Sequence, residues 1–215
     1  MNREDFKGQA PLHKTLNKLR GKSSLFCQKI IYNNKSGLGE IYNRHLENKK
    51  YFNDILLFVH DDVLIEDIFL SEKLNEAIRR FDVVGIAGGL TPNKGALRWF
   101  DPWENLSGAV GHPCNNELII DVTHYGPSPS ECKLIDGLFM AVNVEKVLKL
   151  GVFFDRQFKF HFYDLDFCLS CIKNGLRIGT WPIWVVHYGE GAYGSLEWKE
   201  ESIPFRQKWD GKWPI

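Results

Sequence analysis

The 215-residue sequence predicts an α/β fold, in which helices flank a mixed β-sheet. Segments with strand and helix patterns alternate through the first half of the chain, as they do in proteins of this class. An unbroken apolar run at residues 55–59 supports the prediction, because a strand buried on both faces of a parallel sheet has no polar side. Hydrophobic residues make up 44% of the sequence, which is enough to build a core around such a sheet.

The individual elements follow from apolar periodicity and from turn and capping residues. Residues 1–24 are polar and have only a weak helical pattern. Residues 91–116 contain Pro, Gly, Asn and two Trp without a clear period, and are interpreted as an irregular insertion. Strands are expected at 25–32, 55–59, 83–87, 118–122, 134–142 (interrupted at 136–137), 176–180 and 183–186, and helices at 40–47, 68–81, between Asn143 and Gly151, and at 164–174.

Composition excludes several classes of protein. Lys plus Arg and Asp plus Glu both number 27, so the formal net charge of zero gives no support to nucleic-acid binding or to a polybasic membrane contact. No stretch approaches the roughly 18 apolar residues of a membrane span, and the first ten residues lack the apolar core of a signal peptide. Cys168 and Cys171 form a C-x-x-C pair that could serve redox or zinc chemistry, but without a second close pair all five cysteines are interpreted as cytosolic free thiols.

Two strand ends carry candidate metal ligands. Asp61 and Asp62 follow the run at 55–59, where two adjacent carboxylates repel each other unless positive charge lies near. A divalent cation meets that need and also binds diphosphate oxygens. His187 ends the last predicted strand, and ligands of such sheets bind beyond the carboxyl ends of strands. Taken alone, the pair can also cap a helix or face solvent, and a lone histidine can be structural.

Asp164 and Asp166 lie at the start of the helix predicted at 164–174. Either carboxylate can offset the positive end of the helix dipole. Because residues two apart on a helix point in different directions, only one of them can face a cleft. Asn33, Asn34 and Asn43 flank the first predicted strand, where turn and helix-surface roles are also open to them.

Three segments, in this order over residues 25–190, together resemble the family 2 glycosyltransferases, which have the GT-A fold. They are LFVHDDV at 57–63, IDGLFMAV at 135–142 with GVFFD at 151–155, and FYDLDFC at 162–168 with Gly175 and the VVH of 185–187. The first resembles the Asp-x-Asp strand end of the family, with His60 in the first acidic place. The resemblance implies the GT-A form of a mixed sheet flanked by helices.

The resemblance also implies roles for individual residues. Asp62 and His187 would bind Mn²⁺ or Mg²⁺, with His60 or Asp61 near the ribose or the metal. Asp164 matches the base of inverting members. Tyr32, Asn33 and Asn34 would approach the nucleotide, and Asp136 and Gly137 would line the sugar or acceptor side, with Asp166 as a further candidate there. A single domain at 1–215 would divide into a nucleotide- and metal-binding half (25–122), an acceptor half (123–190) and a tail (191–215).

One departure concerns the first strand, which opens the family's fold with an apolar run and a Pro-Tyr-Asn-like turn. Residues 1–24 contain neither, so the first strand is lacking, degenerate or upstream of Met1. An unpaired sheet edge near Ile30 would then need a cover. We expect residues 1–24 to supply it as helix, or a partner chain or second copy to do so.

The function predicted from the sequence is therefore transfer of a sugar from a nucleotide-diphosphate donor, UDP-linked, to a glycan, lipid or protein acceptor. The reaction would be inverting and metal-dependent, would build a surface polysaccharide, lipid-linked glycan or glycoprotein, and would be cytoplasmic or peripheral at the membrane. A non-catalytic GT-A domain that binds sugar or a partner is the alternative. A metal-dependent nucleotidyltransferase or hydrolase is a third, although Gly88, Gly89 and Lys94 make a poor phosphate loop.

Overall fold

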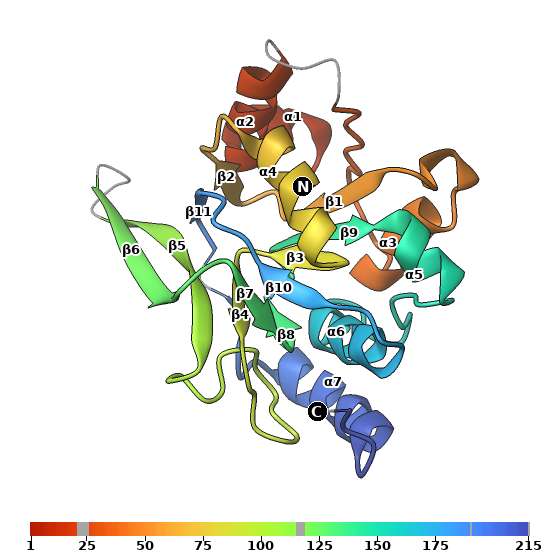
Figure 1. Cartoon of the computed structure of the whole chain (residues 1–215). Coiled ribbons are helices and arrows are strands. Elements are labelled where there is room, and N and C mark those ends of the chain that lie inside the picture. The colour runs from red at the N-terminus through yellow and green to blue at the C-terminus, as the bar shows by residue number, and fades with distance from the viewer. Residues whose placement is uncertain (21–25, 115–118, 190, 215) are drawn as a thin grey trace.

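The computed structural model describes residues 1–20, 26–114, 119–189 and 191–214, and it shows two mixed β-sheets with helices around them (Figure 1). One sheet has the strand order β1-β9-β3-β10-β7, and the other has the order β2-β11-β5-β4-β8 with β6 paired to β5. The mixed α/β fold predicted from the sequence is thus confirmed. The strands are β1 (Ile55–Val59), β2 (Val63–Ile65), β3 (Val83–Gly85), β4 (Ala87–Gly89), β5 (Leu106–Cys114), β6 (Ile119–Gly126), β7 (Ser130–Cys132), β8 (Leu134–Ile135), β9 (Phe139–Asn143), β10 (Ile178–Thr180) and β11 (Val185–His187).

The helices begin and end largely where the sequence places them. Asn143 accepts a hydrogen bond from the Lys146 backbone at the start of α5, and Gly151 and Gly175 take positive φ angles after α5 and α6. The residues after 190, read from the sequence only as a tail, include a long C-terminal helix. The helices are α1 (Arg3–Gln9), α2 (Pro11–Arg20), α3 (Leu38–Leu46), η1 (Lys49–Tyr51), α4 (Leu70–Arg80), α5 (Val144–Lys149), α6 (Tyr163–Lys173) and α7 (Leu196–Trp209).

Residues 60–62 and residues 136–138 are two of the places where the chain crosses from one sheet to the other. The first crossing joins β1 to β2, and the second joins β8 to β9. Because β1 pairs with β9 in antiparallel register, with Val59 opposite Phe139, the two crossings lie next to each other. The His60 backbone N–H donates to the Leu138 carbonyl at 3.1 Å, which joins them directly. Polar residues at both crossings are therefore brought to one place.

Two predicted strands differ from the structure, and several observed strands, among them β2, β5 and β7, were not predicted. Residues 26–31 belong to neither sheet, and Leu25 lies outside the described residues. β1 is antiparallel to β9 and only Phe58 within it is buried, so the expected parallel strand covered on both faces is wrong. Residues 106–114, interpreted as part of an irregular insertion, form the long strand β5.

The N-terminal helices cover an edge of the six-stranded sheet. β2 is the last strand of that sheet, and α2 packs beside it (Figure 1). The hydroxyl of Thr15, fully buried, accepts a hydrogen bond from the Ile65 N–H at 2.7 Å and donates to the Ile65 carbonyl at 3.1 Å. Residues 3–20 are thus helical as expected, but they cover β2 and not a strand at Ile30.

The C-terminal helix α7 is tied to α6 by a buried ion pair. Lys208 Nζ lies 2.7 Å from an oxygen of Asp166, whose side chain is fully buried, and 2.7 Å from Asp155. The Trp209 indole N–H donates to the same Asp166 oxygen at 2.9 Å. No helix in the described parts of the chain is long and apolar enough to cross a membrane.

Candidate active site

A cavity of about 400 Å³ lies at the crossings of residues 60–62 and 136–138. Its polar lining includes His60 and Asp62 from the first crossing, Asp136 from the second, Asp164 from α6 and His187 from β11. Each of these five is a candidate from the sequence, and the fold brings them together from segments more than 100 residues apart. The rest of the lining is largely aromatic.

Asp62 and His187 are adjacent because β11 pairs with β2, which places His187 opposite Val63. The His187 Nε2 atom lies 3.4 Å from an Asp62 carboxylate oxygen, and the Tyr188 N–H donates to the Asp62 carbonyl at 3.0 Å. A Cβ atom at residue 189 would lie 2.4 Å from that carboxylate oxygen and 2.6 Å from Nε2. Only glycine therefore lets the chain pass this close to the pair.

The charges of this pair support each other. Burial disfavours both charged forms, but the hydrogen bond between them and their attraction lower the pKa of Asp62 and raise the pKa of His187. The second Asp62 oxygen, Oδ1, is buried and has no hydrogen-bond partner. A buried carboxylate oxygen without a partner, beside an imidazole, fits a divalent cation. In the described ranges no group of three or more His, Cys, Asp or Glu could hold a metal ion, so a cation here would need further ligands from its substrate or from water.

His60 occupies the first acidic place of the family motif and is held by Tyr163. Its Nε2 atom lies 2.8 Å from the Tyr163 hydroxyl, and its ring stacks near Phe160 at 6.3 Å. Burial lowers the pKa of His60, although the charges of Asp62 and Asp136 oppose this. An imidazole that is hydrogen-bonded to a tyrosine, and whose neutral form is favoured by burial, lines the cavity at this point.

Asp136 and Asp164 form the carboxylate side of the cavity. Asp164 accepts hydrogen bonds from the Gly137 N–H at 3.0 Å and the Leu165 N–H at 2.9 Å. Asp136 accepts from the Leu138 N–H at 3.0 Å and from the Trp99 indole N–H at 2.9 Å. Burial and then the charge of Asp136 raise the pKa of Asp164 to about 7. A carboxyl group that exchanges its proton near neutral pH is suited to general acid–base chemistry.

The backbone before Asp164 is strained. Phe162, immediately before α6, has a φ of 60°, in the left-handed region that non-glycine residues rarely adopt. Its ring is held against two residues of α7, with ring centroids 4.9 Å from Phe205 and 5.3 Å from Trp198. Such strain persists where surrounding contacts fix the backbone, and it is common at functional sites. Here α7 fixes the turn that aims Asp164.

Four of the other sequence candidates lie outside the cavity. The Tyr32 ring packs on Phe6 of α1 at 5.8 Å, and the Asn33 N–H donates to the Met1 carbonyl at 3.0 Å. The Asn34 side chain binds the backbone of Ser36. Asp61 is exposed, and its carbonyl accepts from Leu12 of α2. The structure therefore places Tyr32, Asn33 and Asp61 against residues 1–12, and Asn34 in a local turn.

Gly137 and Asp166 lie beside the site without lining it. A Cβ atom at residue 137 would lie 2.2 Å from the Tyr163 hydroxyl and 2.9 Å from the Asp164 Cβ, so glycine lets the first turn of α6 approach the crossing. Asp166 points away from the cavity into its contacts with Lys208 and Trp209. As the helical spacing predicts, only one carboxylate of the Asp164 and Asp166 pair faces the cavity.

No sequence pattern pointed to the aromatic side of the cavity. We define the aromatic wall as Trp99, Phe100, Trp103, Tyr125 and Tyr193, all of which line the cavity. Neighbouring rings of the wall have centroids 5.0–6.2 Å apart. The two tryptophans in the aperiodic segment 91–116 were the sequence feature that could have indicated this wall. His112 of β5 was also missed, and its ring lies 5.9 Å from that of His187.

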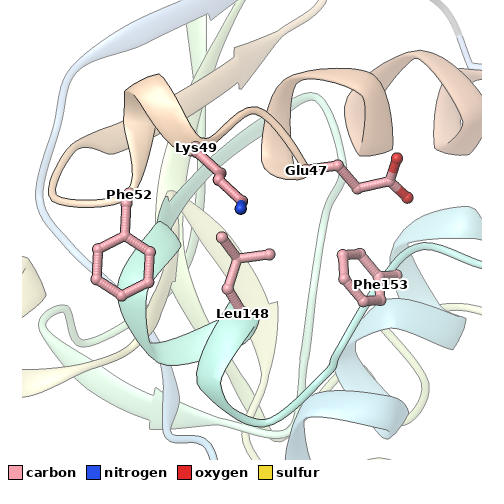
Figure 2. A pocket seen from close by; sticks show the side chains of 5 residues that line it. All are labelled: Glu47, Lys49, Phe52, Leu148 and Phe153. Carbon is pink, nitrogen blue, oxygen red and sulfur yellow. The ribbon is translucent and has the colours of Figure 1, made fainter.

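A second hollow, of about 510 Å³, lies away from this site, between α3, η1 and α5 (Figure 2). Its lining side chains are Glu47, Lys49, Phe52, Leu148 and Phe153. The Glu47 carboxylate is ion-paired with Arg156 at 3.3 Å. Despite its larger volume, this hollow has no set of groups that could act together on a substrate.

Comparison with known families agrees with this geometry. The model of a family described as "glycosyltransferase like family" matches residues 9–207, which is nearly the whole chain and includes every residue of the cavity lining. Comparison with curated proteins gives no match. The mixed sheets flanked by helices agree with a GT-A-like fold. We conclude that the chain belongs to this glycosyltransferase-like family, whose members resemble the family 2 enzymes.

Proposed function

We propose that the chain is an inverting, metal-dependent glycosyltransferase that takes its sugar from a nucleotide diphosphate, and that the donor is UDP-linked. The observation that supports it best is that the Asp62–His187 pair and Asp164 line one cavity. The Asp62–His187 pair supplies ligand atoms for a cation, and Asp164 supplies a base. A transferase of this kind needs both, on either side of the anomeric carbon.

In this proposal Asp62 and His187 hold Mn²⁺ or Mg²⁺, and the unpartnered Asp62 oxygen is the strongest argument for it. A divalent cation at that place would supply Lewis-acid neutralisation of the diphosphate leaving group. His60 lies on the same side and would contact the donor. Tyr32, Asn33, Asn34 and Asp61 have no part in the proposal, because none of them lines the cavity.

Asp164 takes the proton from the acceptor hydroxyl. Its pKa of about 7 places it near the ideal value for a base at neutral pH. The Gly137 and Leu165 N–H groups fix the orientation of its carboxylate. The acceptor is a glycan, lipid or protein hydroxyl, and the product class is a surface polysaccharide, lipid-linked glycan or glycoprotein.

The test is binding of UDP with and without Mn²⁺, measured by calorimetry and by the shift in melting temperature, since a ligand that binds only the folded state raises stability. We expect binding to require the cation and to be lost in Asp62→Ala and His187→Ala. Asp61→Ala is the matched control, because this neighbouring carboxylate is exposed and outside the cavity. Equal loss in Asp61→Ala, or cation-independent binding, would contradict the metal assignment. Binding without any transfer would favour the non-catalytic alternative.

A further inference from the structure

We infer that the aromatic wall binds the pyranose ring of a saccharide acceptor, an assignment that rests on the proposed transfer reaction at the same cavity. The wall consists of three residues from the loop after β4 (Trp99, Phe100, Trp103), one from β6 (Tyr125) and one from the segment before α7 (Tyr193). These five rings converge on one side of the cavity from three separate parts of the chain.

Core packing does not account for this arrangement. Trp99 is buried, with 3% of its surface exposed, but Trp103 and Tyr193 are 57% and 51% exposed. Large aromatic side chains that gather at a cavity and remain half open to solvent indicate a binding surface. Edge-to-face contacts hold the wall in shape: the Phe100 ring lies 5.2 Å from Trp99 and 5.1 Å from Tyr193, at near-perpendicular angles.

The wall belongs to the carboxylate side of the cavity. Its buried member, Trp99, donates its indole N–H to Asp136 at 2.9 Å, and Asp136 is the carboxylate whose charge raises the pKa of Asp164. The Asp62–His187 pair packs against His112 and Gly189, and the charge of Asp136 reaches His187 from the carboxylate side. A ring stacked on the wall is therefore next to the base, where the acceptor hydroxyl has to be.

The chemistry of the lining fits a saccharide. A pyranose has a face of C–H groups, which packs on aromatic rings, and an edge of hydroxyl donors, which carboxylates accept. The cavity provides both, with the wall on one side and Asp136 and Asp164 beside it. A lipid acyl chain offers no donors to these carboxylates, which would be left desolvated. A nucleobase also stacks on aromatic rings, and it is the competing occupant that the test must distinguish.

The probes are maltose, cellobiose and lactose at millimolar concentration, observed by saturation-transfer NMR, and UDP with Mn²⁺ measured in parallel by calorimetry. We expect at least one disaccharide to receive saturation from the wild-type protein. In Trp103→Ala and Tyr193→Ala its affinity should fall roughly threefold to tenfold, as for the loss of one aromatic contact, while UDP affinity is unchanged. Trp103→Phe should retain most of the binding.

Phe69→Ala is the matched control, because Phe69 is as exposed as Trp103 but lies at the start of α4, outside the cavity. Two results would overturn the inference: no saturation of any of the three disaccharides, or a fall in UDP affinity in Trp103→Ala, which would assign the wall to the nucleobase. Failure of the proposed function is a separate result. In that case UDP with Mn²⁺ does not bind the wild type, whatever the disaccharides do.

Discussion

At the scale of single residues, the proposed reaction depends most on the carboxylate of Asp164. We expect Asp164→Asn to keep UDP–Mn²⁺ affinity and to lower the transfer rate roughly 10²–10⁴-fold, as for the loss of a general base. The measurement is UDP release with the best saccharide acceptor, alongside calorimetry with UDP and Mn²⁺. Asp166→Asn is the comparison: its side chain is buried against α7, so it should change stability and leave the rate per folded molecule unchanged. Transfer at the wild-type rate in Asp164→Asn would make Asp136 the next candidate.

A second prediction at this scale concerns Gly137. An added methyl group would lie 2.2 Å from the Tyr163 hydroxyl and 2.9 Å from the Asp164 Cβ, so Gly137→Ala must push the start of α6 away from the crossing. We expect a loss of about 1–3 kcal/mol in the free energy of unfolding, as for overpacking, and a lower transfer rate. Gly8→Ala is the control, because a methyl group in α1 meets nothing within 4 Å. Equal stability of the two variants in urea would show that the crossing has room to relax.

Half of the candidate site could be predicted from residue patterns and half could not. Asp62, Asp136, Asp164 and His187 follow strands or begin a helix, and strand ends gather at one edge of a sheet. The aromatic wall has no such signal, because its rings come from a loop, a strand and a segment before a helix. Tyr32, Asn33 and Asn34 were placed by analogy with a strand that the structure does not form. Tyr32 packs on α1, and the local sequence barely indicates that helix.

At the scale of secondary-structure elements, one hydroxyl group, that of Thr15, joins α2 to the backbone of β2. The Thr15 hydroxyl, which is fully buried, satisfies both backbone groups of Ile65. Thr15→Val keeps the shape but leaves the N–H and carbonyl without partners, so we expect a loss of about 1–3 kcal/mol in unfolding free energy. Thr15→Ser keeps the hydroxyl and should lose less than Thr15→Val. If chemical denaturation shows the Thr15→Val variant to be as stable as the wild type, the backbone N–H and carbonyl of Ile65 have found other hydrogen-bond partners.

The strands that the sequence misplaced have physical explanations. Phe26, Ile30 and Ile31 favour a strand, but a strand needs a partner, and the local sequence says nothing about one. β5 was missed because it contains Gly108, Gly111 and Pro113, which are typical of loops. The glycines are there for close approach: a Cβ atom at residue 108 would lie 1.9 Å from the Ile86 carbonyl oxygen. Gly108 has a φ of 104° and lies where the pairing of β5 with β6 shifts register, so it marks an irregularity in the ladder as well as close packing.

At the scale of the whole molecule, the site exists because two of the crossings between the sheets, at residues 60–62 and 136–138, lie next to each other. Both sheets contain strands from before and after residue 122, so each depends on the complete chain order. Two of the helices then hold in place the segments that carry the residues of the site. α2 binds the backbone of β2 and of Asp61, and α7 holds the strained turn before Asp164. A local change in either terminal helix is therefore transmitted to the cavity through one or two contacts.

The raised pKa of Asp164 should be visible in how the free energy of unfolding depends on pH. Its pKa in the folded protein is raised to about 7, whereas a carboxyl in the unfolded chain has a pKa near 3.9. Between these values the unfolded state binds fewer protons than the folded state, so this group makes stability fall as pH rises, and its effect is complete above about pH 7. Asp164→Asn removes the titration. The free energy of unfolding of the variant minus that of the wild type should therefore rise from about pH 4 to about pH 7, by at most about 1.4 kcal/mol per pH unit, and then level off.

Urea denaturation of both proteins across this range is the measurement. Carboxylates whose pKa is lowered, such as Asp67 and Asp155, give the opposite slope, but they contribute equally to both proteins and cancel in the difference. The amide of Asn also meets the Gly137 and Leu165 N–H groups less well than a carboxylate, which adds an offset that does not depend on pH. Asp61→Asn, at an exposed carboxylate, is the control. A difference between wild type and Asp164→Asn that stays flat from pH 4 to pH 7 would mean that Asp164 is already ionised in the folded protein, and that it enters the reaction as a carboxylate at any physiological pH.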